Sequence, residues 1–502
     1  MSLALKSHRL KNHATSLHRF LSSSSSSPSS IRRIGIGTNK LSLPNTPDGT
    51  FPSVIATSIQ NSITTFETTL HKEEEMRRGI TDAIMFLQSQ NKVIPPVDVI
   101  GKISYRTGVE EIKGDVLQET NDGINVYHNQ SPEFIQQTME TSPLVDLKRS
   151  IQEVNLTYCL HNPEAQSKIL LEKDAPLDEI RGQLNETLTN AFTQLETLVQ
   201  EDVIDGYGVC SNGLSLQSSH PMHLSWEDVL LASKNASESL GVENHLQVMQ
   251  LPINLLETYG LKVANRIKQE NQNVKIHATR PLTCFPSRTG EGYPFKIVDY
   301  LLQDGFQQQW THKMNGIPST YASVLNETMG YFDAEHLLEI KEEGEQPLTT
   351  EERETLDGCK LLQSMIHDLD ANLSSGQYRS YPAYEEDLYT KVVPLIHDTF
   401  EELDGDSAEL LQRFFEAHGT AVRYKIANIT RELLKKGGDN GSGEKYDVPD
   451  DQTLQEYAIQ YLLQQKVDGG LLNGEPLLDR VIVGCPKAEH VIEVVHACEA
   501  TG

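Results

Sequence analysis

The sequence predicts an α/β protein: a (β/α)8 barrel that carries a mostly helical insertion between its seventh and eighth strands. Three features lead to this prediction. Short apolar runs alternate with helical patterns over residues 31–285, and this alternation favours parallel strands joined by helices. Only helical patterns follow over residues 286–450. A helix, a strand and a closing helix over residues 451–502 bring the number of strands to eight.

The first four strands are expected at residues 34–39, 63–66, 97–102 and 154–161. A helical pattern covers residues 51–62. A further helix is predicted to start at Ser131-Pro132-Glu133, because serine caps, proline suits the first turn and glutamate favours the positive end.

The fourth strand ends at His161, and Asn162-Pro163 closes it with a turn. The carboxyl ends of barrel strands open onto one face, where such enzymes keep their chemistry. His161 is therefore a candidate catalytic residue, and a histidine packed for structural reasons is the alternative.

The second half of the barrel is expected to contain a helix at residues 184–201 and strands at residues 203–209, 245–250 and 274–278. After the insertion, a helix at residues 453–465, a strand at 480–484 and a helix at 488–500 complete it.

The insertion contains strong helical signals. Thr349 and Glu352 have the spacing of a capping box. Apolar residues then repeat at helical spacing over residues 362–369 and again over residues 411–433. His418 lies on the second apolar face and is expected to be packed there. Because such faces need burial, the insertion is predicted to be a folded domain with no convincing strands.

Residues 1–30 are predicted to be a transit peptide or a disordered tail. No acidic residue precedes Asp48, the early positions are basic, and a serine run covers residues 22–27. Apolar residues at positions 10, 14, 17 and 21 would share one helix face. Basic, serine-rich and amphipathic leaders direct import into organelles, and the arginines favour a mitochondrial location. A plastid or cytoplasmic location is the alternative.

Composition narrows the classes of partner. The formal net charge of −28 argues against a general nucleic-acid binder, which needs basic surface to displace counterions. No apolar run is long enough to cross a bilayer, so no membrane partner is expected. The six cysteines lie far apart without a CxxC pair, which is poor material for a metal site or a disulfide framework.

Seven motifs occur at the expected strand ends, in one order. They are Gly-Ile-Gly-Thr at 35–38, Lys102, Leu-His-Asn-Pro-Glu at 160–164, Tyr-Gly-Val-Cys-Ser-Asn at 207–212, Gln250, Arg-Pro-Leu at 280–282 and Val-Gly-Cys-Pro-Lys-Ala-Glu-His at 483–490. In this combination the chain resembles the aldo-keto reductases, specifically the branch whose fourth strand ends in His-Asn-Pro-Glu. The resemblance covers most of residues 33–285 and 451–500 and leaves out the insertion.

The resemblance implies reduction of an aldehyde or ketone with NADPH, or the reverse reaction. The family uses a tyrosine acid, a lysine beside it, an aspartate that holds the lysine, and a histidine directed at the substrate oxygen. Lys102 and His161 match their counterparts. Glu67 stands in the place of the aspartate, one methylene longer.

The family tyrosine is missing. Its place falls on Lys72 or His71, and His71 is a hypothetical proton donor because imidazole titrates near neutral pH. Tyr105 follows the third strand and is not expected to reach back to the site.

The cofactor implied is NADP. Ser211, Asn212 and Gln250 match the residues that hold the nicotinamide amide in the family. The helix expected after the eighth strand would receive a phosphate at its N-terminus. Further candidates for cofactor binding are Gly37, Thr38, Arg280, Lys487 and His490.

Two classes of function follow. The first is an NADP-dependent oxidoreductase that acts on a small carbonyl substrate. The second is a barrel that has weakened or lost turnover, and that binds NADP(H) as a sensor or acts as a scaffold, with the helical insertion contacting a protein partner. The missing tyrosine favours the second class, and retention of five other site residues favours the first.

Overall fold

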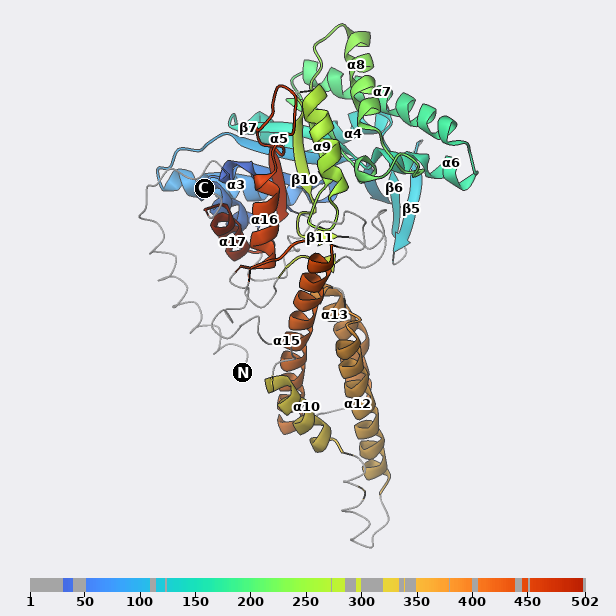
Figure 1. Cartoon of the computed structure of the whole chain (residues 1–502), viewed down its shortest axis with the longest axis vertical. Coiled ribbons are helices and arrows are strands. Elements are labelled where there is room, and N and C mark those ends of the chain that lie inside the picture. Colours follow the sequence, from blue (N-terminus) through green and yellow to red (C-terminus); the bar gives the residue numbers. More distant parts are fainter. Residues whose placement is uncertain are drawn as a thin grey trace.

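Eight parallel strands close into a barrel in the computed structural model of the chain (Figure 1). The structure describes residues 30–38, 51–108, 114–121, 124–271, 273–284, 295–298, 319–333, 338, 349–378, 380–399, 405–437, 445–449 and 452–499. Around the barrel the strands are β1 (Ile34–Gly37), β13 (Arg480–Gly484), β10 (Lys275–Thr279), β9 (Leu246–Pro252), β8 (Gly206–Cys210), β7 (Val154–His161), β3 (Val97–Ile103) and β2 (Thr65–Thr69). The predicted fold class is confirmed, and each predicted barrel strand overlaps an observed one.

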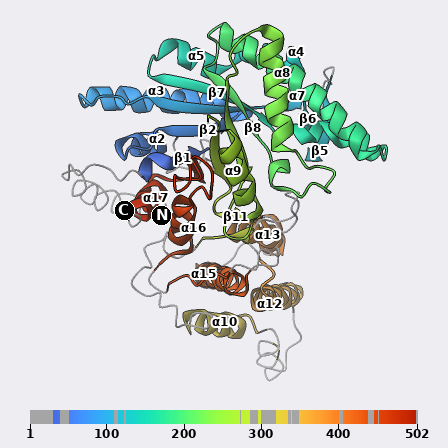
Figure 2. The same ribbon diagram turned by 45° about the horizontal axis from the view of Figure 1, so that its top comes forward.

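Helices surround this barrel (Figure 2). Ser131 accepts a hydrogen bond from the backbone of the helix that follows it, as its sequence signal predicts, and Thr453 caps its helix in the same way. The helices are α2 (Phe51–Gln60), α3 (Glu73–Ser89), α4 (Pro132–Thr141), α5 (Pro143–Ser150), α6 (Lys168–Glu172), α7 (Leu177–Gln200), α8 (Trp226–Leu240), α9 (Tyr259–Glu270), α16 (Leu454–Gln464) and α17 (Ala488–Glu499).

Side chains along each barrel strand point alternately outward, toward the helices, and inward, into the barrel, so two separate apolar clusters form. Leu156, Tyr158 and Leu160 belong to the large apolar cluster that joins the barrel to its helices. Cys159, between them, belongs instead to a small cluster with residues of β3, β8 and β9. Successive strand residues point to opposite faces, so Cys159 and His161 both face the barrel interior.

Two small sheets are additions that the sequence analysis missed. The strands β4 (Tyr105–Gly108), β5 (Val116–Asn121) and β6 (Ile124–His128) form an antiparallel sheet directly after β3. The strands β11 (Thr283–Cys284) and β12 (Phe295–Lys296) form a second. The prediction that residues 286–450 contain no strand is therefore wrong at β12. The strands β4, β11 and β12 have only two to four residues, too few for apolar alternation to show.

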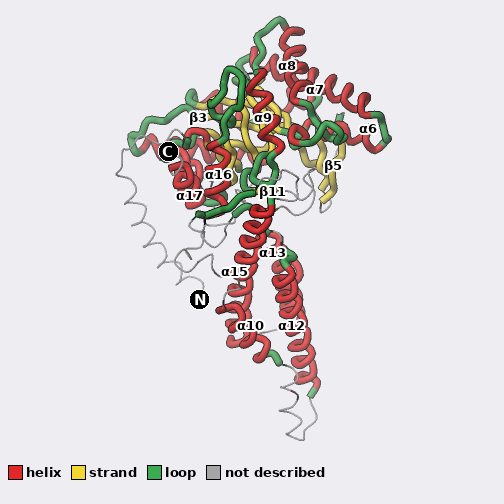
Figure 3. Tube along the Cα trace, viewed as in Figure 1, coloured by secondary structure: helices red, strands yellow, loops and turns green. Residues whose placement is uncertain are grey.

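The insertion projects from the barrel as a group of helices (Figures 1 and 3). An apolar cluster of its own joins the helices, and His418 is buried within it. Tyr384 Oη and Leu369 O each lie 3.1 Å from a ring nitrogen of His418, which confirms the packed role. The elements are α10 (Ser319–Tyr331), α12 (Thr350–Ser375), α13 (Tyr381–Asp387), the π-helix η7 (Leu388–Val392), α14 (Val393–Thr399) and α15 (Gly405–Lys436).

The insertion is attached on the side where the strands end. Ala427 and Leu434 of α15 join an apolar cluster with Leu255 and Leu256, which follow β9. The hydroxyl of Thr430 also donates to the carbonyl oxygen of Lys296 in β12, at 3.3 Å. The base of α15 therefore lies at the rim of the barrel mouth.

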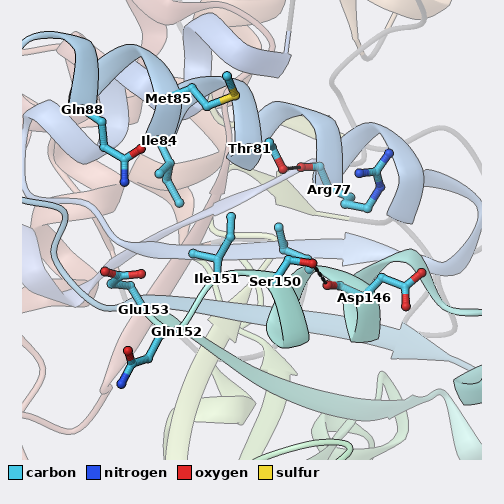
Figure 4. Close-up of a pocket in the computed structure, with 11 residues that line it drawn as sticks. Arg77, Thr81, Ile84, Met85, Gln88, Asp146, Ser150, Ile151, Gln152 and Glu153 are labelled. Atoms are coloured by element: carbon cyan, nitrogen blue, oxygen red, sulfur yellow. Dashed lines mark hydrogen bonds between the residues drawn. The ribbon is translucent and has the colours of Figure 1, made fainter.

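A groove on the outer flank of the barrel separates α3 from α5 (Figure 4). One end of the groove lies at residues 151–153, which connect α5 to β7. These residues precede β7, whereas His161 is its last residue, so the groove lies far from the barrel mouth along this strand. It is lined by Arg77, Thr81, Ile84, Met85, Gln88, Asp146, Leu147, Ser150, Ile151, Gln152 and Glu153.

None of the helices in the described ranges is both long enough and apolar enough to span a membrane. All six cysteines are buried as free thiols. The predicted leader, residues 1–30, lies outside the described residues except for Ser30.

A buried polar triad fixes the wall between β7 and the helices. Tyr158 Oη donates to Glu73 Oε1 at 2.7 Å, and Ser142 Oγ donates to Glu73 Oε2 at 2.8 Å. Burial raises the pKa of Glu73 to about 7 against the hydrogen bonds from these two hydroxyls, which lower it. The ring of Tyr158 covers Gly101 on β3, where a methyl group would lie 2.5 Å from its Cε1 atom.

Gly101→Ala should lower the free energy of unfolding by about 1–3 kcal/mol, because the held ring of Tyr158 cannot move aside. Urea denaturation at pH 7 measures this. Gly182→Ala is the matched control, since Gly182 lies in α7 with open space around it. That control should gain about 0.5–1 kcal/mol. Equal stabilities for the two variants would contradict the packing described.

Glu73→Gln should remove one contribution to the dependence of stability on pH. Between about pH 5 and 7 the folded protein keeps a proton on Glu73 that the unfolded chain has lost, so the contribution of Glu73 to stability falls as pH rises. Buried histidines with lowered pKa values, among them His128 and His161, contribute in the opposite direction. The two proteins should therefore differ in the slope of stability against pH: over this range the free energy of unfolding of the variant, relative to that of the wild type, should rise by on the order of 2–3 kcal/mol. Glu164 and Glu493, whose pKa burial also raises to about 7, contribute equally to both proteins.

Denaturation curves at several pH values measure this slope. Glu74→Gln is the control. The hydrogen bond from Arg77 lowers the pKa of Glu74 to about 2. Any change of stability that comes from the titration of Glu74 therefore occurs below pH 5. An unchanged slope in Glu73→Gln would show that Glu73 is ionised in the folded protein at pH 5.

Candidate active site

A buried ion pair lies inside the barrel near the mouth. Lys102 on β3 and Glu67 on β2 are each 5% exposed, and Lys102 Nζ lies 2.6 Å from Glu67 Oε1. The strands β2 and β3 are hydrogen-bonded neighbours, with Thr69 opposite Lys102. Both are residues that the resemblance of the sequence indicates for the site, and the structure brings them together.

The charge of Lys102 is held by its neighbours. Burial lowers its pKa, but Cys210 and the carboxylate of Glu67 outweigh burial, and the pKa rises above the ordinary 10.5. Burial raises the pKa of Cys210 to about 11 although Lys102 opposes this, so Cys210 is a neutral thiol at pH 7. The stabilising charge beside Lys102 is therefore that of Glu67.

His161 ends β7 and is partly exposed at the mouth. Burial lowers its pKa well below the ordinary 6.5, and the charge of Lys102 lowers it further. The ring is therefore neutral at pH 7, and it can donate or accept one hydrogen bond at each nitrogen according to its tautomer.

The backbone of His161 is held by His128, the last residue of β6. Gln166 Nε2 donates to His128 Nδ1 at 3.0 Å, so the proton of the neutral His128 ring is on Nε2. His128 Nε2 lies 2.9 Å from the carbonyl oxygen of His161 and donates to it. Burial lowers the pKa of His128 to about 4. The sequence analysis missed this residue.

Tyr105 contacts His161. The two rings meet edge to face with centroids 5.0 Å apart, and Tyr105 makes a similar contact with His128 at 4.9 Å. Asn162 Nδ2 donates to the phenolic oxygen at 3.3 Å. The expectation that Tyr105 cannot reach the site is therefore wrong: β4 turns back directly after β3 and carries the ring over the mouth.

The place of the missing tyrosine is a short 3-10 helix, η2 (Leu70–Lys72), at the end of β2. His71 is exposed, with Nδ1 3.2 Å from Thr69 Oγ1. Burial and the neighbouring Lys72 lower the pKa of His71 below 6.5. Lys72 Nζ donates to the carbonyl oxygen of Thr38 at 3.3 Å. Both candidates thus lie beside the mouth.

The loop after β8 is held by the His-Asn-Pro-Glu turn. Glu164 accepts hydrogen bonds from Ser211 Oγ at 2.7 Å and from the backbone N–H of Gly213 at 2.8 Å. Asn162 Oδ1 accepts from the backbone N–H of Asn212 at 3.1 Å. The proposed cofactor residues Ser211 and Asn212 are therefore fixed in place by the motif that precedes them.

Gln250 on β9 is fully buried. Its Nε2 lies 3.4 Å from Nδ1 of His277, a buried residue on β10 that the sequence analysis did not single out. Gln250 Oε1 has no hydrogen-bond partner among the described residues. A buried acceptor is thus left at the base of the mouth.

The other proposed cofactor residues lie around the rim. Gly37 ends β1 and would bring a Cβ within 3.9 Å of Glu67 Oε1, and Thr38 follows it, buried. Arg280, in the left-handed region at φ 55°, pairs with Glu257 at 3.0 Å. Lys487 is exposed directly before α17. His490 lies in the first turn of that helix together with Glu489, whose charge opposes an anion.

Comparison with protein-family models gives no match. Comparison with curated proteins also gives none.

Solved structures with similarity include a Pseudomonas aeruginosa protein assigned as an aldo-keto reductase (14% identity, TM-score 0.30, 51% of this chain and 77% of that one). A Bombyx mori aldo-keto reductase in complex with NADP has 11% identity and a TM-score of 0.30, covering 55% and 72%. A thermostable aldo-keto reductase bound to the inhibitor epalrestat has 13% identity and a TM-score of 0.30, covering 65% and 94%. The closed order of eight parallel strands is what establishes the barrel.

Glu67→Gln should lower the free energy of unfolding by about 3–5 kcal/mol at pH 7, because it leaves the Lys102 ammonium buried without its counter-charge. Urea denaturation measures the loss. Glu67→Asp, which keeps the charge on a shorter side chain, should retain most of the stability. Equal losses in both variants would show that the shape of Glu67, rather than its charge, is what the site requires.

Proposed function

We propose that the protein is an NADP-dependent oxidoreductase of the aldo-keto reductase type that interconverts a carbonyl compound and an alcohol. The observation that carries the proposal is the buried Lys102–Glu67 ion pair beside a neutral His161 at the carboxyl end of a (β/α)8 barrel. Active sites of this fold lie at that end. Burying two charges costs desolvation free energy, and buried charges of this kind are typical of functional sites.

The residues present fit a nicotinamide cofactor. The unpartnered, buried Oε1 of Gln250 can accept from the carboxamide N–H, and Asn212, partly exposed beside it, offers a side-chain amide. Lys487 at the start of α17 suits a phosphate, as helix N-termini do. When bound, the reduced cofactor supplies a hydride to the carbonyl carbon.

The side chains of the mouth match the needs of carbonyl reduction. Negative charge develops on the carbonyl oxygen as its carbon accepts hydride, and preorganised donors stabilise that charge. The ammonium of Lys102 supplies a fixed positive charge, and the neutral ring of His161 supplies an N–H donor. The oxygen must also receive a proton, and His71 is the donor proposed from the sequence.

The alternative function is a barrel that binds NADP(H) without turnover, as a sensor or as a scaffold for a protein partner. The specific observation in its favour is that η2 supplies no tyrosine. The insertion exposes Tyr389 and Val393 on adjoining helical segments, which would suit a partner. NADPH binding without reduction of any carbonyl would establish this alternative.

His161→Ala should lower the rate of carbonyl reduction by about 100-fold or more, the usual effect of removing a positioned donor. NADPH affinity, measured by fluorescence titration, should stay within about three-fold, since His161 is not among the proposed cofactor contacts. The assay follows the loss of NADPH absorbance with a panel of aldehydes and quinones. His367→Ala, an exposed histidine on α12, is the control and should match the wild type.

Turnover that survives in His161→Ala would remove this residue from the chemistry. Failure of the wild type to bind NADPH would contradict the proposed function itself.

A further inference from the structure

The backbone turn between Lys102 and Tyr105 places the side chain of Tyr105 at the barrel mouth. Ser104 has φ 133°, in the region that favours glycine, and it is fully buried. Two hydrogen bonds hold it there: its carbonyl oxygen accepts from the N–H of Asn129 at 2.7 Å, and its Oγ accepts from the N–H of His161 at 3.3 Å. This anchored residue directs β4 back across the end of β7.

The ring of Tyr105 is clamped between two histidines. It meets His161 and His128 edge to face, and His128 is itself fixed by Gln166 and by the carbonyl oxygen of His161. The ring therefore has one position relative to His161. A packing role alone would need neither the hydroxyl group nor a defined partner for it.

The hydroxyl of Tyr105 is left as a donor. Asn162 Oδ1 accepts from the backbone of Asn212, so the amide orientation is fixed and Nδ2 faces Tyr105. In that hydrogen bond the phenolic oxygen is the acceptor. Its own proton has no acceptor among the residues that the structure describes, and Tyr105 is partly exposed. The proton is therefore available to a ligand in the mouth.

Electrostatics keep this donor protonated. Burial raises the pKa of Tyr105 to about 12; the hydrogen bond from Asn162 opposes this, and the charge of Glu164 adds to it once that carboxyl group ionises near pH 7. The pKa of His161 and that of His71 are both lowered, so those rings are mainly neutral at pH 7. Tyr105 thus carries its proton throughout the range in which the histidines lose theirs.

We infer that Tyr105 is the proton donor of the site, in place of the tyrosine that η2 lacks. The inference rests on the proposed function. As hydride adds to the carbonyl carbon, the π electron pair of the C=O bond moves onto oxygen. That oxygen takes the proton from Tyr105 Oη, so the phenolic O–H bond breaks and the alcohol O–H bond forms. The phenolate accepts the Asn162 hydrogen bond and regains a proton from water.

The test compares Tyr105→Phe with Tyr127→Phe. Tyr127 lies in β6 of the same sheet and also accepts from an asparagine amide, that of Asn125 at 3.0 Å, without contacting His161. Single-turnover reduction of a carbonyl substrate should slow about 100-fold in Tyr105→Phe and stay near the wild-type rate in Tyr127→Phe. NADPH affinity and the circular dichroism melting curve should be unchanged in both, which separates lost chemistry from lost folding.

The pH profile gives a second readout. With Tyr105 as donor, the wild-type single-turnover rate should be flat from pH 6 to 9, since an acid with a pKa of about 12 stays protonated. With His71 as donor, the rate would fall as pH rises through the lowered pKa of His71, so a histidine donor would already be largely spent at pH 7. A falling profile, or a Tyr105→Phe rate within about three-fold of wild type, overturns the inference and leaves the proposed function intact. A wild type that neither binds NADPH nor reduces any carbonyl overturns both.

Discussion

The ion pair between Lys102 and Glu67 is the constraint that sets the electrostatics of the barrel mouth. Two charges removed from water are costly, and their attraction offsets that cost only when geometry and surroundings are right. The closed sheet supplies these surroundings: neighbouring strands fix the two backbones, and Cys210 and Gln250 line the same interior. An apolar pair would hold the barrel together as well or better. The proposed reaction gives the buried pair a role at the mouth that stability alone does not require.

The additions to the barrel complete the site from the other side. The sheet formed by β4, β5 and β6 places Tyr105 and His128 around His161, and the insertion is anchored through α15 beside the loop that follows β9. Both additions are attached where strands end. The mouth therefore lies between the Lys102–Glu67 ion pair inside the barrel and the side chains that these additions place above it. The bulk of the insertion points away from the barrel (Figure 1), which separates its role at the rim from any role of its far helices.

The eight strands could be predicted because each carries an apolar run long enough to show, and His161 because it ends such a run. Lys102 and Glu67 could be placed at the site only through the resemblance of their motifs to those of the aldo-keto reductases. The return of β4 could not, because it depends on the positive φ of Ser104, a residue whose type gives no hint of it. His128 and His277 look like isolated histidines in the sequence, and only pairing across strands brings them to the site. The pairing of Arg280 with Glu257 is likewise a tertiary contact without a local signal.

The electrostatics of the mouth give Lys102, His161 and Tyr105 different proposed roles. A lysine kept charged by Glu67 lowers the pKa of a nearby imidazole, so Lys102 and His161 cannot both be cationic at pH 7. His161 is then a neutral hydrogen-bond donor and a poor source of protons, and Lys102 keeps its proton because losing it would leave the Glu67 carboxylate buried without a counter-charge. The proposed reduction, in a barrel with these charges, needs a separate proton donor that does not depend on imidazole titration. The phenol of Tyr105, held against His161 by the sheet of β4, β5 and β6, satisfies that requirement although it comes from β4 and not from the end of β2.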